Sequence, residues 1–178
     1  MATYKEIVTK AVIGKGKKVY TDKYTITPEI NPTTVLGCWV INHNFKGFKS
    51  NDKIGVDGSY DVNIWYSYEN DSKTTVINKK ITYSDLFNVS IKENADLSSD
   101  IDVIVRSLKQ PNCTKVNIED SKINFVIEKE LGVELVGETK VKIAIEEDED
   151  EWEEIVDIDE TLKDIDKVDE NYIEDNKE

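Results

Sequence analysis

The sequence predicts an all-β protein, with an antiparallel β-sandwich-like body of short strands and a disordered or partly helical acidic C-terminal tail. In the first 145 residues, apolar and polar side chains alternate with period two, and turn-forming residues separate the alternating runs. Acidic residues are concentrated after this region, because residues 146–178 hold 18 acidic side chains and three lysines whereas residues 1–145 are almost neutral. We therefore expect a β-rich body at 1–145 and a separate tail at 146–178.

The N-terminal segment fits two secondary structures. Thr3 and Glu6 stand at the spacing of a capping box and accompany a helical stripe of apolar residues. The stripe consists of Tyr4, Ile7, Val8, Ala11 and Val12. β-Branched residues are frequent here, however, and residues 9–19 also read as a strand. We expect one short helical turn at most, followed by a strand that bends at Gly14 or Gly16.

The clearest strand covers residues 56–66, where alternate side chains are mostly apolar and the intervening ones are mostly polar. One face of this strand consists of Val56, Gly58, Tyr60, Val62, Ile64 and Tyr66. The same alternation predicts a strand at 34–42, with one face made of Val35, Gly37, Trp39 and Ile41. Further strands are expected at 76–83, 86–91, 103–108, 123–131 and 140–145, and turns at several places that include Pro111-Asn112.

The tail carries an apolar stripe among its acidic residues. Its members recur every three or four positions and are Trp152, Ile155, Ile158, Leu162 and Ile165. This spacing would place them on one face of an acidic helix, which is marginal alone because like charges crowd its other face. A partner that covers the stripe would stabilise the helix, so we predict that these five residues bind partner proteins. A solvated acidic tail with scattered apolar residues is the alternative.

The rare reactive side chains point to no catalytic, cofactor-binding or metal-binding site. His43 is the only histidine, and at the end of a predicted strand it is expected to make local hydrogen bonds. Cys38 and Cys113 form no CxxC pair, and two thiols with one imidazole leave a zinc site one ligand short. We expect reduced thiols, with a crosslink through Cys38 or Cys113 only in an oxidising environment.

The positive charges do not favour a nucleic-acid partner. The chain has 22 lysines and a single arginine, Arg106, whereas phosphate-binding surfaces favour the forked guanidinium of arginine. The glycine-lysine segment at 14–18 lacks the spacing of a P-loop, and we interpret it as a basic bend that could meet an acidic neighbour. The apolar runs are short, so we expect neither a signal peptide nor membrane insertion.

Several short strings, taken in order, resemble the outer spore coat morphogenetic protein CotE family of endospore-forming bacteria. They are TKAV at 9–12, WVINH at 39–43, YDVNIWYSY at 60–68, QPNC at 110–113 and VGETKV at 136–141. The acidic segment DEWEE at 150–154 is similar to the tail of that family. The glycine-rich stretch at 14–16 and a tail richer in isoleucine and valine depart from the family pattern. These departures bear on which partners the tail selects.

The resemblance implies a non-enzymatic scaffold without cofactors. Such a protein is made in the mother-cell cytoplasm and then becomes part of the spore coat. It associates with itself around the forespore, docks on an inner coat layer and recruits outer coat client proteins, partly through its acidic tail.

A ligand-binding β-sandwich is the competing interpretation. Exposed aromatic side chains can stack on sugar rings, and a carbohydrate platform would use Trp39, Trp65, Tyr66 and Tyr68. Trp65 falls among polar residues on its strand, which would suit an exposed platform, but we expect it instead to cover a neighbouring sheet or a contact with another copy.

Overall fold

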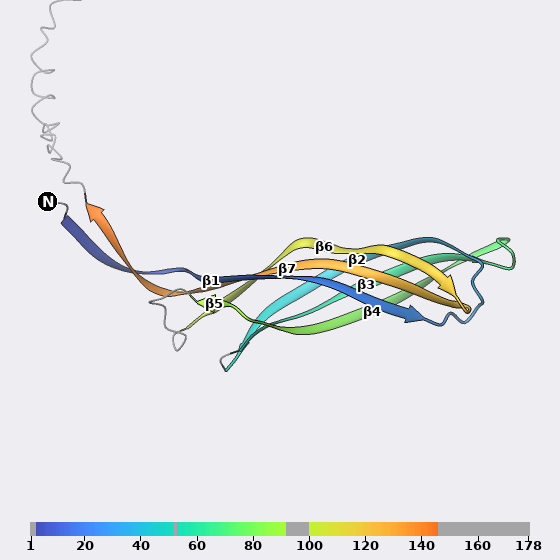
Figure 1. Ribbon diagram of the computed structural model, residues 1–178, viewed down its shortest axis with the longest axis horizontal. Helices are drawn as coiled ribbons and strands as arrows, with labels where there is room; N and C mark the ends of the chain where they lie inside the picture. Colours follow the sequence, from blue (N-terminus) through green and yellow to red (C-terminus); the bar gives the residue numbers. More distant parts are fainter. Residues whose placement is uncertain (1–2, 52, 92–99, 146–178) are drawn as a thin grey trace, which may run out of the picture. The chain divides into compact units, whose positions relative to one another are not determined.

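The computed structural model describes residues 3–51, 53–91 and 100–145, and these are almost entirely β-strand. The strands are β1 (Thr3–Ile26), β2 (Thr34–Ser50), β3 (Lys53–Tyr68), β4 (Lys73–Phe87), β5 (Ser90–Ile91), β6 (Asp102–Glu119) and β7 (Lys122–Ile145) (Figure 1). The described residues contain no helix, so the predicted all-β class is confirmed. The tail at 146–178, for which we expect disorder or partial helix, lies outside the described residues.

The strands form two antiparallel sheets, one of order β5-β1-β7-β6 and one of order β2-β3-β4. Turns that contain residues with positive φ connect strands that follow one another in the sequence. The β6–β7 hairpin turns at Asp120 and Ser121, whose φ angles of 49° and 61° are those of a type I′ turn. Asn51, with φ of 53°, lies between β2 and β3. Short side chains such as Asp and Asn adopt this left-handed conformation more readily than most others.

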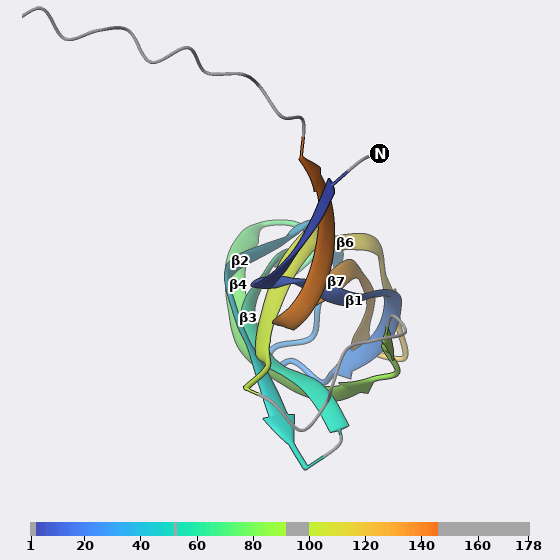
Figure 2. The same cartoon turned by 90° about the vertical axis from the view of Figure 1, so that its left-hand side faces the viewer.

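The core lies between the two sheets, which face each other across a shared interior (Figure 2). Alternate residues of β3 and β7 fill most of it, because each is an inner strand of its sheet. One cluster consists of Tyr60, Val62, Ile64, Tyr66, Ile81, Ile123, Phe125 and Ile127, and a second of Ile13, Ile54, Val56, Phe87, Leu131, Val133 and Leu135. Complete burial of one such aliphatic or Phe side chain stabilises the fold by about 1.5–3 kcal/mol. The predicted apolar face of residues 56–66 is confirmed.

The described N-terminal residues form no helical turn, and the strand expected at residues 9–19 is confirmed. β1 runs as strand from Thr3, and the described glycines have no positive φ. Gly14 instead permits a close approach, since a Cβ there would lie 2.9 Å from the Ser90 carbonyl oxygen on β5. The strand does contain an irregularity, because its inward positions change from odd at Ile13 to even at Tyr20. Pairing with neighbouring strands therefore determines the secondary structure of this segment. The spacing of its apolar residues alone would also have allowed a helix.

Several predicted strands are longer than their local pattern indicated. Residues 123–131 and 140–145 belong to the single strand β7, and β4 continues through the expected break after residue 83 as far as Phe87. The expected turn at Pro111-Asn112 is wrong, because both residues lie within β6. Pro111 is tolerated there because β6 is an edge strand whose register shifts between Lys109 and Asn112.

The predicted common face on residues 35–41 is also wrong. The register between β2 and β3 shifts between Val35 and Gly37, and one extra residue reverses which side chains point inward. Val35 and Val40 pack against the first core cluster. Trp39 and Ile41 are exposed instead.

Candidate functional site

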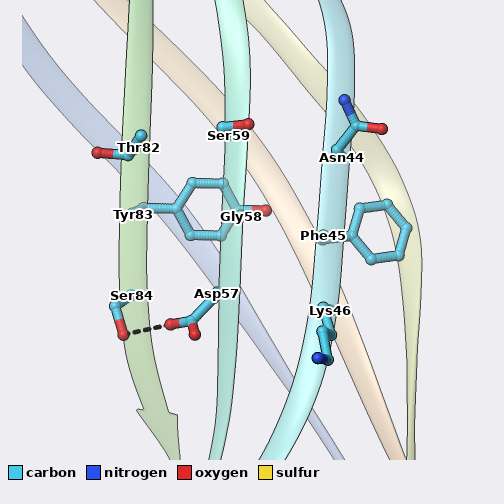
Figure 3. Close-up of a pocket in the computed structure, with 9 residues that line it drawn as sticks. All are labelled: Asn44, Phe45, Lys46, Asp57, Gly58, Ser59, Thr82, Tyr83 and Ser84. Atoms are coloured by element: carbon cyan, nitrogen blue, oxygen red, sulfur yellow. Dashed lines mark hydrogen bonds between the residues drawn. The ribbon is translucent and has the colours of Figure 1, made fainter.

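A shallow cavity of about 590 Å³ lies over the sheet of β2, β3 and β4 (Figure 3). Its lining is Asn44, Phe45, Lys46, Asp57, Gly58, Ser59, Thr82, Tyr83 and Ser84. The Ser84 hydroxyl donates to Asp57 Oδ1 at 2.6 Å, and the Tyr83 ring lies across Gly58. The lining offers hydrogen-bonding groups for a small polar ligand. The one carboxylate of the lining, Asp57, is already hydrogen bonded.

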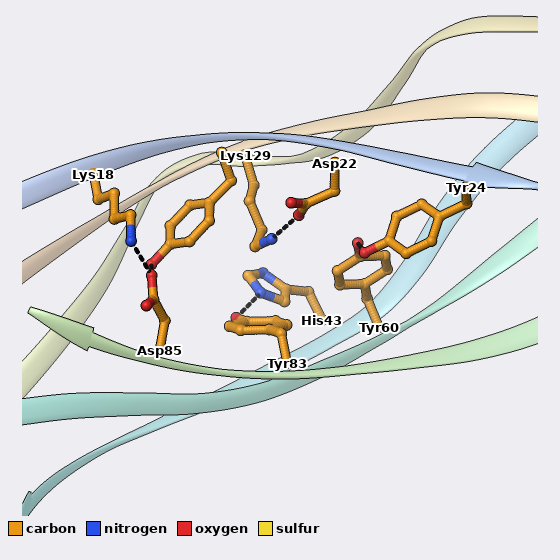
Figure 4. Close-up of polar contacts among 9 residues, drawn as sticks. Lys18, Asp22, Tyr24, His43, Tyr60, Tyr83, Asp85 and Lys129 are labelled. Atoms are coloured by element: carbon orange, nitrogen blue, oxygen red, sulfur yellow. Dashed lines mark hydrogen bonds and ion pairs between the residues drawn. The ribbon is translucent and has the colours of Figure 1, made fainter.

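A second candidate is a polar network inside the core, built around Lys129 on β7 (Figure 4). Lys129 is only 1% exposed, and its Nζ lies 2.7 Å from Asp22 Oδ2 on β1. The ammonium lies 4.3 Å from the centroid of the Tyr20 ring, 4.5 Å from that of Tyr83 and 5.7 Å from that of Tyr60. The carboxylate and the faces of the three rings together compensate for the loss of water around the charge.

His43 joins this network, contrary to the expectation of local hydrogen bonds at a strand end. It lies within β2, where its Nε2 is 2.8 Å from the Tyr83 hydroxyl and its Nδ1 is 3.2 Å from Gln110 Oε1 on β6. Burial and the nearby Lys129 ammonium hold the pKa of His43 below its usual value, against the opposing effect of Gln110. Neutral His43 therefore links β2 to β4 and β6.

The tyrosines of the network are all held in their neutral form. Burial raises the pKa of Tyr83 to about 12 and also raises the pKa of Tyr20 and Tyr60 above 10. The Tyr20 hydroxyl donates to Asp85 Oδ2 at 2.8 Å, and Lys18 forms an ion pair with the same carboxylate. Burial disfavours the charged form of Asp85, but the hydrogen bonds from Lys18 and Tyr20 outweigh it and lower the pKa of Asp85.

The network joins the two sheets. Lys129 and Asp22 belong to the four-stranded sheet, whereas His43, Tyr60 and Tyr83 belong to the three-stranded sheet. Its charged and polar groups bind one another within the core. We therefore assign the network a structural role in the fold. The sequence patterns did not predict this network, although Lys129 is the one charged residue among the alternate apolar positions 123–135.

The structure brings the two cysteines together. Cys38 on β2 and Cys113 on β6 are both free, half-buried thiols that pack against the first core cluster. Burial raises the pKa of the Cys38 thiol, and its hydrogen bond with Cys113 raises it further. A crosslink through Cys38 or Cys113 in an oxidising environment stays a prediction. The thiol of Cys113 also donates to the carbonyl oxygen of Lys115 at 3.4 Å.

Two tryptophans share the outer face of the three-stranded sheet. Trp39 is 53% exposed and Trp65 is 43% exposed. The Trp39 ring lies over Gly37, where a Cβ would be 2.3 Å from it, and Gly37 pairs with Trp65 across the strands. Tyr66 is 2% exposed and points into the core. The four aromatics of the predicted carbohydrate platform therefore do not lie on one face, but its two tryptophans do.

The basic segment at 14–18 is strand rather than the expected bend, and its lysines pair with acidic residues of the same chain. Lys15 Nζ lies 3.0 Å from Glu134 Oε1, and Lys17 Nζ lies 3.3 Å from Glu130 Oε1. Hydrogen bonds from Lys15 and Arg106 lower the pKa of Glu134. This face of the four-stranded sheet thus combines both signs of charge.

The tail residues predicted to bind partners, Trp152, Ile155, Ile158, Leu162 and Ile165, lie outside the described residues. Within the described ranges no three His, Cys, Asp or Glu side chains gather as metal ligands would. In the same ranges no helix has the length and apolar character to cross a bilayer.

Comparison with known proteins shows the family of the chain. A family model described as outer spore coat protein E (CotE) matches residues 3–175. No curated protein and no solved structure matches the chain. Because the family model covers almost all of the sequence, the chain belongs to the outer spore coat protein E (CotE) family, a family of structural coat proteins with a morphogenetic role in the spore coat.

Proposed function

We propose that this protein is a non-enzymatic scaffold of the spore coat that associates with itself around the forespore and recruits outer coat proteins. The observation that carries the proposal is the family match over residues 3–175. In this proposal the protein is made in the mother-cell cytoplasm, docks on an inner coat layer and remains in the coat.

The proposal divides the work between two parts of the chain. The β-rich body at 1–145 holds position and associates with itself, and its exposed strand edges and surface tryptophans support this role. The tail at 146–178 recruits clients, since its dense negative charge would attract cationic partners over a long range. The apolar stripe of Trp152, Ile155, Ile158, Leu162 and Ile165 then adds contacts at short range.

Replacing the five stripe residues with serine in the full-length protein is expected to abolish recruitment of outer coat proteins and leave self-association unchanged. The tail would keep its charge but lose the apolar face that a client covers. The measurement is electron microscopy of coat layers in sporulating cells that carry only the variant, together with light scattering of the purified protein.

A matched variant replaces Glu153, Glu154, Asp157 and Asp159 with their amides and keeps the stripe intact. We expect it to recruit clients more slowly and with a weaker dependence on salt, because only the long-range attraction is reduced. Normal outer coat assembly by the stripe variant would contradict the role assigned to the tail.

A carbohydrate-binding function is the second candidate, favoured by the shared exposure of Trp39 and Trp65. Trp65→Ala is expected to lower the free energy of unfolding by about 1 kcal/mol, because more than half of the side chain is covered and it lies on the middle strand of its sheet. Urea denaturation measures this change. On a glycan array, we expect the wild-type protein to show no selective binding. Selective binding that Trp65→Ala removes would favour the carbohydrate function over the scaffold.

A further inference from the structure

We propose that the outer edge of β1 at residues 4–12 pairs with the same edge of a second copy, antiparallel and centred on Val8. This inference rests on the proposed function, since it names the surface through which a self-associating scaffold would bind itself.

The first part of β1 and the last part of β7 form a two-stranded ribbon within the described residues. Among the described residues, β5 pairs with β1 at Gly14 and Lys15 alone, and β6 pairs with β7 no further than Val136. Beyond these points β1 and β7 continue side by side (Figures 1 and 2). An ion pair between Lys142 Nζ and Glu6 Oε1, at 3.8 Å, joins the two strands of the ribbon.

The core does not cover this ribbon. Residues 4–10 are all exposed, with Tyr4 at 64% and Val8 at 62%. Two strands alone are marginally stable in water, and three or more strands with an apolar face are needed for independent stability. The β1 side also presents a row of backbone donors and acceptors that another strand can satisfy. A partner strand would therefore stabilise the ribbon and cover its apolar side chains.

The charges along β1 are complementary to themselves, which points to a second copy as the partner. In an antiparallel pair centred on Val8, Glu6 lies opposite Lys10 of the second copy, and the two-fold symmetry repeats this pair. On the same face Tyr4 lies opposite Val12, and Val8 lies opposite Val8. Unlike charges and apolar pairs directly opposite one another both stabilise a sheet.

Neighbouring registers lack this complementarity. Sliding the second copy by one residue can place Lys5 opposite Lys10, and centring the pair on Glu6 places that carboxylate opposite itself. Like charges directly opposite each other destabilise a pair of strands. Within one chain Glu6 contacts Lys142 and Lys10 contacts Asp102, but all four side chains are more than half exposed. Such ion pairs are weak, so they leave Glu6 and Lys10 free to face a partner.

A charge exchange in the full-length protein tests the register. Glu6→Lys and Lys10→Glu each place like charges opposite one another twice in the dimer, and each is expected to weaken self-association by about tenfold or more. The double variant exchanges the two charges and is expected to restore it. Lys5→Glu alters the charge as Lys10→Glu does but faces Ala11, so it should have little effect. Sedimentation velocity over a concentration series measures the association.

The double variant also separates this contact from the ion pairs within one chain. Exchanging both charges breaks the Glu6–Lys142 and Lys10–Asp102 pairs together. If those pairs caused the effects of the single variants, the double variant would associate more weakly than either. Circular dichroism confirms that each variant keeps its β structure.

A cysteine at position 8 provides an independent test that does not depend on charge. Opposite residues in antiparallel strands have Cα atoms about 4.5–5.5 Å apart, within the range of a disulfide. With oxidised glutathione, two Val8→Cys chains are expected to form one intermolecular disulfide while one glutathione disulfide is reduced to two thiols. All the compared chains also carry Cys38→Ser and Cys113→Ser, because the two native thiols are free and could crosslink in the same oxidant. In that background Tyr4→Cys, whose partner is Val12, and the chain without a new cysteine should stay monomeric on a non-reducing gel.

The outcomes distinguish the ribbon contact from the scaffold function. Rescue by the charge exchange together with crosslinking through position 8 supports the contact. Self-association that is unaffected by Glu6→Lys and gives no crosslink overturns the ribbon contact and leaves the scaffold proposal standing. A full-length wild-type chain that remains monomeric at all concentrations overturns both.

Discussion

Asp22→Asn is expected to lower the free energy of unfolding by about 3 kcal/mol, near the lower end for breaking a buried ion pair because Asp22 itself is partly exposed. The substitution keeps the shape of the side chain but removes the carboxylate charge that pairs with the Lys129 ammonium. Lys129 is 1% exposed, so water cannot replace the lost carboxylate without opening the two sheets. Urea denaturation at neutral pH measures the change.

Lys129→Met is the matched control, because it removes the buried charge together with its need for a partner. We expect a smaller loss of stability than for Asp22→Asn, and the double variant Lys129→Met/Asp22→Asn should lose less than the two single losses added together. If Asp22→Asn destabilised the protein no more than Lys129→Met does, the carboxylate would not be compensating the buried ammonium.

Raising the pH above 10 is expected to unfold the protein steeply. Burial raises the pKa of Tyr83 to about 12 from its ordinary value of 10.0, and raises the pKa of Tyr20 and Tyr60 in the same direction. The folded state therefore keeps these protons where the unfolded chain releases them. Their contribution to stability is complete below pH 10 and is lost as the pH rises through the folded pKa values. Each tyrosine lowers the free energy of unfolding by at most about 1.4 kcal/mol per pH unit.

Urea denaturation at pH 8, 10 and 11 checks this dependence. Tyr83→Phe should reduce the slope above pH 10, because one of the buried phenols can no longer ionise. Comparing the two proteins at the same pH removes the contribution of the lysines, which begin to lose their charge in the same range. Equal free energies of unfolding at pH 8 and pH 11 would show that the phenols are not held neutral by the fold.

The sequence predicted the inner strands best. The alternation at 56–66 identified the core face of β3. In an inner strand of a sheet that is covered on one side, buried apolar residues alternate with exposed polar ones along the sequence. The edge strands were harder to predict. Pro111 in β6 resembled a turn, and the extra residue after Val35 in β2 reversed the predicted face. Both features depend on how a neighbouring strand pairs with the irregular one.

The candidate site residues were likewise only partly predictable from the sequence. The polar neighbours of Trp65 in the sequence left both exposure and coverage open, and the structure shows the side chain to be 43% exposed. The burial of Lys129 did not follow from the sequence, although its place among apolar residues marked it as unusual. Its carboxylate partner lies 107 positions away in the sequence, on another strand. The proximity of Cys38 and Cys113 likewise required strands from both sheets to be placed together.

The amino-acid sequence by itself determined that the protein is built from β-strands, which residues of the inner strands are buried, and that negative charge is concentrated after residue 145. These properties are local, since side-chain alternation and charge density can be read within a few neighbouring residues. Only the tertiary structure decided the register of the edge strands, the burial of Lys129 among aromatic rings and the pairing of β1 with β7. Each of these depends on contacts between distant segments, whose free energies become defined only when the two sheets have come together.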